Sequence, residues 1–292
     1  MKTAGSSRKN GITLYGDKYA VTFWYDKKRQ DYIYGLYPIA DENGDAVRKI
    51  RKIPVVRGLY SIFRNPGMLA SAGISTLSAA GALLTLRDKK SMRILGGICL
   101  GAGYAYLGAL FYHIFGTDGK VRQYHGAEHK VIEAYEKQKG RITQEQAEEA
   151  SRISRRCGTN FIVYYFASQA VFGWLPLGHG LVQQGLITGL AYEGFRLPEE
   201  KAPALKEVLN QAGDLLQRYV TTAEPDRPKL EAARIAMNLL VDAESGKLSD
   251  DKIAYFRKNA DKRPLMDKLI GSGGERGVSS KRKTGGTSSG DG

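Results

Sequence analysis

Several residue types and patterns are scarce in this chain, and each scarcity excludes a class of protein. Only two of its 292 residues are cysteines, Cys99 and Cys157. This number excludes a disulfide-rich scaffold and favours a reducing compartment. The N-terminal residues 1–10 contain no apolar run, so we expect no signal peptide. No internal repeat is visible, which argues against a repeat architecture.

Histidine is equally scarce, but its placement is informative. Two of the four histidines, His125 and His129, lie four residues apart, and a helix would place them on one face where both could bind one cation. Glu128 precedes the second histidine, which completes an H-x-x-E-H pattern like that of inverted zincins. Glu128 could accept a proton from a metal-bound water as general base. The alternative is an exposed amphipathic helix. A catalytic zinc needs a third protein ligand.

The charge is strongly basic, with 44 Lys and Arg against 30 Asp and Glu and a net charge of +14. The basic residues cluster beside the most apolar stretches. This pattern predicts an anionic lipid membrane as partner. The tyrosine-rich and basic N-terminal region could suggest nucleic acid, but half-buried strands have the same composition, so we expect no nucleic-acid partner.

Long uncharged runs dominate the middle of the chain, at 67–86, 94–117 and 157–192. About 20 apolar residues are needed to span a membrane as a helix. The third run is interrupted at 176–180 and leaves two shorter segments. These runs predict three to four transmembrane helices, with both termini cytoplasmic in a bacterial cell membrane. The basic loop 87–93 would then lie outside, against the positive-inside rule. Two buried helical hairpins are the alternative.

The predicted fold class is therefore an α-helical integral membrane protein with a small N-terminal β-meander and C-terminal soluble helices. Tyrosine and β-branched residues alternate between Ile12 and Tyr37, which predicts the strands. Thr143 and Gln146 form a capping box for a helix expected to end near Arg155. The predicted regions are a β-rich region (1–46), a basic amphipathic segment (47–66), a membrane hairpin (67–117), a polar insert with the HxxEH helix at 122–139 (118–158), a second membrane hairpin (159–196), helices at 205–219, 229–243 and 249–259 (197–265), and a disordered tail (266–292).

Two residues compete to be the third metal ligand. Arg155 and Arg156 flank Cys157, and their charges would lower its pKa and favour the thiolate as ligand or nucleophile. Alternatively, Cys157 is a small buried residue and the arginines bind lipid phosphate or another anion. Glu193 is an isolated acid at the end of an apolar run, where its cost suggests a function.

Five segments together carry a family resemblance: KIPVVRGLYSIF (52–63), RQYHGAEHKVIEAYE (122–136), RRCGTNF (155–161), LAYEGFR (190–196) and LLQRYVTTAEPD (215–226). In this order they resemble the YqhQ-like family, a bacterial and plastid group of multi-pass membrane proteins described as predicted metal-dependent enzymes without an established function. The resemblance covers about residues 47–245. It places these residues on the family's motif positions: His125, Glu128, His129, Arg156, Cys157, Tyr192 and Glu193. Members commonly carry a histidine where this chain has Ser154.

The resulting hypothesis is a metal-dependent membrane hydrolase at the cytoplasmic membrane surface. A divalent ion, zinc by preference, would bind His125 and His129 together with Glu193 or Cys157. Carboxylate ligation would favour an open catalytic site, with a Glu193 oxygen about 4 Å from an imidazole nitrogen, and thiolate ligation a closed structural one. The alternative is a non-catalytic membrane scaffold, assembly factor or transporter component, with a membrane-protein partner or a second copy.

Overall fold

The structure of the protein is a computed structural model. It describes residues 1–39, 49–50, 52–58, 60, 81, 84–85, 88–115, 119–172 and 181–260.

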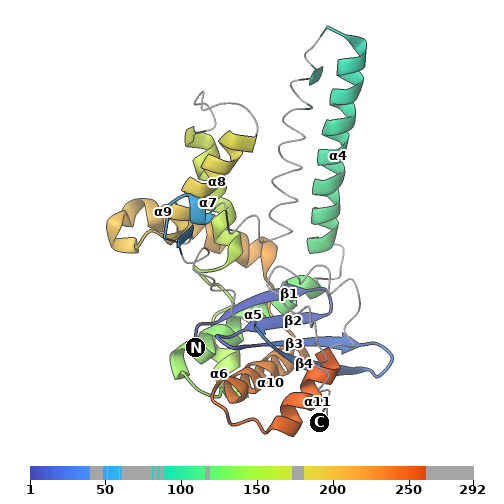
Figure 1. Cartoon of the computed structure of the whole chain (residues 1–292), viewed down its shortest axis with the longest axis vertical. Coiled ribbons are helices and arrows are strands. Elements are labelled where there is room, and N and C mark those ends of the chain that lie inside the picture. Colours follow the sequence, from blue (N-terminus) through green and yellow to red (C-terminus); the bar gives the residue numbers. More distant parts are fainter. Residues whose placement is uncertain are drawn as a thin grey trace, which may run out of the picture.

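A four-stranded antiparallel sheet forms the N-terminal part of the fold (Figure 1). Its spatial order follows the chain: β1 (Ala4–Arg8), β2 (Gly11–Tyr15), β3 (Tyr19–Asp26) and β4 (Asp31–Pro38). The predicted β-meander is thus confirmed. Residues 1–10 contain β1, which lies before the strands predicted from Ile12 onward and pairs along its whole length with β2. Isolated hairpins are marginal, so the sheet needs helices packed against it.

Helices α5 (Lys120–Gln138) and α10 (Arg227–Glu244) supply that packing. α5 contacts β1 and β2, while α10 contacts β3 and α5. The shared core is apolar and almost fully buried, and its side chains come from all three units: Phe23, Leu36, Val131, Met237 and Leu240. Burial of such side chains contributes roughly 1.5–3 kcal/mol each. α5 is therefore held rigidly along the sheet, and with it the two histidines.

A second group of helices lies beyond the sheet (Figure 1). α7 (Gly158–Phe172) packs against α8 (Leu181–Arg196) and α9 (Pro203–Leu216), and α9 continues into a π-helical turn, η2 (Gln217–Thr221). A short 3₁₀ turn, η1 (Glu199–Lys201), precedes α9. α4 (Lys90–Phe115) extends away from the sheet.

No helix in the described part of the chain is both long and apolar enough to cross a membrane. The predicted second hairpin forms α7 and α8, which contain 15 and 16 residues. At a rise of about 1.5 Å per residue they extend roughly 23–24 Å, less than a hydrocarbon core of about 30 Å. This finding contradicts the predicted integral membrane fold with three to four transmembrane helices and the multi-pass membrane location. The predicted first span, 67–86, lies almost wholly outside the described residues.

The predicted polar insert, residues 118–158, contains two helices. The helix expected at 122–139 is α5, and Lys139 ends it with a left-handed φ of 56° and an N–H bonded to the Tyr135 carbonyl. The capping box at Thr143 is present and opens α6 (Gln144–Glu149), but α6 ends six residues before Arg155. The C-terminal helices expected at 205–219, 229–243 and 249–259 correspond to α9 with η2, α10 and α11 (Asp250–Ala260). The predicted disordered tail at 266–292 lies outside the described residues.

Candidate metal centre

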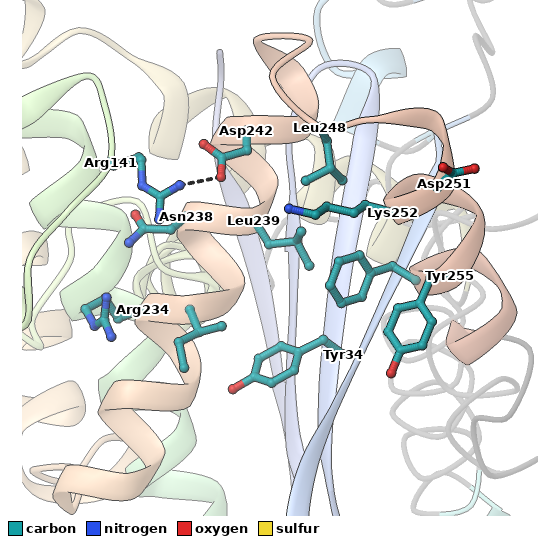
Figure 2. Close-up of a pocket in the computed structure, with 12 residues that line it drawn as sticks. Tyr34, Arg141, Arg234, Asn238, Leu239, Asp242, Leu248, Asp251, Lys252 and Tyr255 are labelled. Carbon is teal, nitrogen blue, oxygen red and sulfur yellow. Dashed lines mark hydrogen bonds and ion pairs between the residues drawn. The ribbon is translucent and has the colours of Figure 1, made fainter.

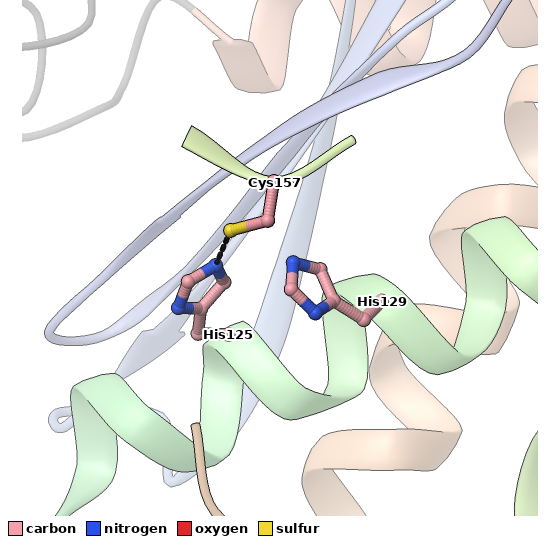
Figure 3. A group of neighbouring side chains, drawn as sticks. All are labelled: His125, His129 and Cys157. Carbon is pink, nitrogen blue, oxygen red and sulfur yellow. Dashed lines mark hydrogen bonds between the residues drawn. The ribbon is translucent and has the colours of Figure 1, made fainter. Parts of the chain in front are cut away.

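The HxxEH segment lies in the middle of α5, as its spacing predicts. The rings of His125 and His129 are neighbours, with centroids 4.4 Å apart and planes inclined by 66° (Figure 3). His129 is buried, and His125 is partly exposed. The helical period alone accounts for this pairing, because residues i and i+4 stack on one face.

Cys157 completes a three-residue cluster with the histidines, here called the His/His/Cys cluster (Figure 3). Its Sγ lies 3.2 Å from His125 Nε2, and one ligand atom from each of the three residues lies within 4.8 Å of the other two. Cys157 directly precedes α7 and is only 8% exposed. The fold therefore brings one of the two predicted third ligands to the histidine pair.

Backbone carbonyls determine the tautomer of both histidines. His125 Nδ1 lies 3.0 Å from the Thr221 carbonyl, and His129 Nδ1 lies 2.7 Å from the Arg152 carbonyl. A carbonyl can only accept a hydrogen bond, so each Nδ1 must carry the proton. The lone pair of each neutral ring is then on Nε2. This arrangement, in which the second ring nitrogen donates to a backbone carbonyl, is typical of histidines that bind a metal.

The cluster offers donor atoms that could bind a tetrahedral metal ion. Zinc binds imidazole nitrogen at about 2.0–2.1 Å and thiolate sulfur at about 2.3 Å, which places such ligand atoms roughly 3.3–3.7 Å apart. The 3.2 Å distance between Cys157 Sγ and His125 Nε2 is close to this value. Two nitrogens and one sulfur also match the ligand preference of zinc, and three protein ligands leave a fourth position open.

Glu193 is not part of the cluster. Its Oε1 accepts hydrogen bonds from Arg57 Nε at 2.7 Å and from the Val55 backbone N–H at 3.1 Å, and its Oε2 pairs with Arg57 Nη2. The Arg57 guanidinium holds the pKa of the Glu193 carboxyl below its usual value. The carboxylate is therefore hydrogen-bonded to residues of the segment before α4. The expected approach of Glu193 to an imidazole is not observed.

The two arginines that directly precede Cys157 are paired with acidic residues. Arg155 lies 3.1 Å from Glu199 and 3.4 Å from Glu207, and Arg156 pairs with Glu136 of α5. Each arginine is exposed. An anion at this point would have to compete with these carboxylates, although exposed pairs of this kind contribute only about 0–1 kcal/mol.

Glu128 points from α5 toward the sheet. A Cβ at Gly5 of β1 would lie 2.5 Å from its carboxyl oxygen, so the missing side chain makes room for the acid. Burial raises the pKa of Glu128 to about 7, although nearby His125 and a hydrogen bond with Ser7 oppose the shift. Its Oε2 is buried without a hydrogen-bond partner among the described residues. Such an orphaned polar atom calls for an explanation, which a functional role would provide.

The residues that orient the cluster were not predicted from the sequence. Thr221 and Arg152 act through backbone carbonyls, which any residue type could supply, so no sequence pattern could reveal them. Thr159 was also missed: its N–H and hydroxyl lie 3.4 Å from Cys157 Sγ, and its hydroxyl lies 3.1 Å from the Thr221 hydroxyl. Ser154, the departure from the family pattern, bonds to Gln217 through its backbone N–H.

Apart from the His/His/Cys cluster, a pocket of about 610 Å³ lies between α10, α11 and β4 (Figure 2). Tyr34, Tyr255 and Phe256 form much of its wall. Arg141 crosses one end of it and pairs with Asp242 at 2.5 Å. No residue of the His/His/Cys cluster lines this pocket, so the two features are separate.

The fold and the cluster define an α+β protein in which a histidine-bearing helix packs along a meander sheet. Residues 100–243 match the family model described as "Protein of unknown function (DUF1385)". This range contains the whole cluster but not the sheet. The resemblance to the YqhQ-like family, whose function is unknown, is therefore confirmed for this part of the chain.

The particular relative found is the "Uncharacterized protein YqhQ" of Bacillus subtilis (strain 168). The two proteins are 34% identical over 136 residues, which are 43% of this chain and 42% of the relative. The chain thus matches less than half the length of this relative. No solved structure matches the chain.

Proposed function

We propose that the protein is a metal-dependent hydrolase whose centre holds one divalent ion, zinc by preference, between His125, His129 and Cys157. The observation that supports this proposal is the convergence of three ligand atoms within 4.8 Å, with both histidine lone pairs on Nε2. A zinc ion with one open position lowers the pKa of a water bound to it and polarises a substrate carbonyl or phosphoryl oxygen.

The residues around the ligands have distinct roles in this proposal. The Thr221 and Arg152 carbonyls hold the imidazoles as neutral ligands. Glu128, three residues after His125 and next to His129, is the general base that accepts a proton from the attacking water. Its buried carboxyl with an unpartnered Oε2 supports this role. Positioned proton transfer of this kind contributes typically 10²–10⁴-fold to rate.

Metal analysis of purified variants tests the proposal. We expect about one zinc per chain in the wild type and in Glu128→Gln, and strongly reduced metal in His125→Ala, His129→Ala and Cys157→Ala. Glu193→Gln is the matched control and should keep its metal, because Glu193 pairs with Arg57 instead. A wild-type protein that takes up no zinc, cobalt or manganese on reconstitution would refute a metal centre.

Activity assays then separate catalysis from structure. A panel of chromogenic esters, phosphoesters and amides should contain a substrate that the zinc-loaded wild type hydrolyses, and Glu128→Gln should hydrolyse it at least 100-fold more slowly with metal retained. Loss of fold on zinc removal, without hydrolysis of any substrate, would identify a closed structural site instead.

A thiol nucleophile is a second candidate function, and the 3.2 Å contact between Cys157 Sγ and His125 Nε2 favours it. In a Cys–His pair the imidazole takes the thiol proton and the thiolate attacks an acyl carbon. Chelation distinguishes the two functions. Hydrolysis that persists in metal-free protein and is abolished by alkylation of Cys157 would support the nucleophile.

A further inference from the structure

The end of α9 is wound as a π-helix, an uncommon structure that often marks functional sites. Residues Gln217–Thr221 form this turn, and the Thr222 N–H bonds to the Gln217 carbonyl at 3.0 Å, five residues back. The last carbonyls of a helix have no N–H partner within the helix and must be satisfied by other groups.

Those carbonyls accept hydrogen bonds from α5 and from the segment before α7. The Thr221 carbonyl accepts from His125. Arg122 Nη2 donates to the Tyr219 carbonyl at 2.9 Å and to the Thr222 carbonyl at 3.2 Å. The negative end of the helix dipole therefore faces Arg122 and His125 of α5.

Arg152 connects the same turn to the second histidine. Its carbonyl accepts from His129 Nδ1 at 2.7 Å, and its Nη1 donates to the Thr222 hydroxyl at 2.7 Å. The group that orients His129 is thus tied to the turn that orients His125. One structural unit controls both rings.

Gln217 anchors this unit to the third ligand. Its side chain is fully buried. Its Oε1 accepts from the Ser154 N–H at 2.8 Å, and its Nε2 donates to the Ser154 carbonyl at 3.0 Å and to Asn160 Oδ1 at 2.9 Å. Ser154 and Asn160 lie on either side of Cys157, so one amide side chain fixes the turn to the segment that carries the thiol.

We propose that the Gln217–Thr222 turn is a positioning unit for the metal centre and that Gln217 is its key positioning residue. It sets the Nδ1–H tautomer of both histidines and holds the Cys157 segment opposite their Nε2 atoms before any ion binds. The inference rests on the proposed metal centre but concerns a property of the metal-free protein. Loss of hydrogen-bonded groups behind metal ligands typically lowers metal affinity 10–100-fold.

Gln217→Leu is the decisive variant because it keeps the side-chain volume and removes all three hydrogen bonds. Gln211→Leu is the matched control, since Gln211 lies on the same helix, is exposed, and bonds only to Glu207 among the described residues. The first readout is the ¹⁵N NMR spectrum of the histidine rings in metal-free protein. We expect Nδ1–H tautomers of His125 and His129 in the wild type and in Gln211→Leu, and mixed tautomers in Gln217→Leu.

The second readout is Co²⁺ titration, monitored by the thiolate-to-metal absorption band. Affinity should fall 10–100-fold in Gln217→Leu and change less than twofold in Gln211→Leu. Wild-type tautomers and affinity in a folded Gln217→Leu protein would overturn the inference. So would an equal loss in Gln211→Leu.

Thr222→Val keeps the test decisive if Gln217→Leu fails to fold. This isosteric change removes the hydroxyl that binds Arg152 Nη1, and the tautomer of His129 should become mixed. An unchanged His129 spectrum would overturn the inference. A wild type that binds no Co²⁺ would refute the proposed function, while the metal-free tautomers would still decide the role of the turn.

Discussion

Cys157 lies where a bound ion would control its reactivity. Its Sγ contacts His125 and Thr159, whereas Cys99, the other thiol, is partly exposed on α4. The thiolate is the reactive form of cysteine and also the form that binds metal. In the proposed metal centre a bound ion would compete with alkylation for the sulfur atom of Cys157, and it would not do so for Cys99.

We predict that Zn²⁺ slows alkylation of Cys157 at least tenfold and leaves the rate at Cys99 unchanged. Peptide mass spectrometry after timed treatment with iodoacetamide measures both rates in one sample, so Cys99 is an internal control. Equal rates at Cys157 with and without Zn²⁺ would contradict a thiolate ligand.

Glu193 was predicted to be a metal ligand, but its carboxylate pairs with Arg57. An acid at the end of an apolar run requires a partner. That partner is Arg57, which lies 136 residues earlier in the chain, and no local pattern connects the two. We predict that Glu193→Gln retains full metal affinity and lowers the free energy of unfolding by about 1 kcal/mol at pH 7.

The pH dependence of this loss follows from the lowered pKa of Glu193. The folded protein holds the carboxyl ionised more firmly than the unfolded chain does. The stabilisation is therefore present above the unfolded pKa of about 4.3 and disappears as the pH falls through the lower folded value. Urea unfolding should show a wild-type advantage at pH 7 that becomes smaller as the pH is lowered to 3. The exposed Glu200→Gln is the control, and an advantage that is undiminished at pH 3 would contradict the assignment.

At the scale of elements, the helices are predictable and the first strand is not. α5, α9 and α10 show apolar residues at helical spacing, and α6 has a capping box within four consecutive residues. These signals are local. β1 has the sequence AGSSR, which contains no β-branched or aromatic residue. It becomes a strand because β2 offers its hydrogen-bonding edge and α5 covers it, and both are tertiary effects.

Gly5 in β1 tests the contact between this strand and α5. A Cβ there would lie 2.5 Å from the Glu128 carboxyl. We predict that Gly5→Ala lowers the free energy of unfolding by about 1–3 kcal/mol, the usual range for overpacking. Urea denaturation measures the change, and the exposed Ser6→Ala is the control. In a Glu128→Ala background most of the loss should disappear. A loss of equal size in that background would show that Glu128 is not the obstacle.

At the scale of the whole molecule, the His/His/Cys cluster and its surroundings form where three segments of the chain meet. α5 supplies the histidines, the segment before α7 supplies the thiol, and the chain after α9 closes over α5. This closure is tight at Gly126, where a Cβ would lie 2.1 Å from the Ala223 carbonyl oxygen. The Ala223 N–H in turn bonds to the Arg122 carbonyl at 2.9 Å.

We predict that Gly126→Ala lowers the free energy of unfolding by about 3 kcal/mol and metal affinity at least tenfold, because the Thr221 carbonyl must move away from His125. Gly140→Ala is the control, since a Cβ there would lie 3.9 Å from the Gln138 carbonyl oxygen, an ordinary contact distance. Thermal unfolding and Co²⁺ titration measure the two effects. Wild-type affinity in Gly126→Ala would show that this closure does not position the ligand.

The sequence by itself determined the pairing of His125 with His129, because four-residue spacing on a helix is a local property. It also identified Cys157 and Glu193 as the possible third ligands. Only the tertiary structure shows that Cys157, and not Glu193, lies beside the two histidines, because this depends on where Arg57 and α7 lie relative to α5. Uncharged runs suggested membrane spans, since run length records hydropathy and not the length of the helix that forms. The third run forms two helices of 15 and 16 residues, and α7 packs against α8 and α9.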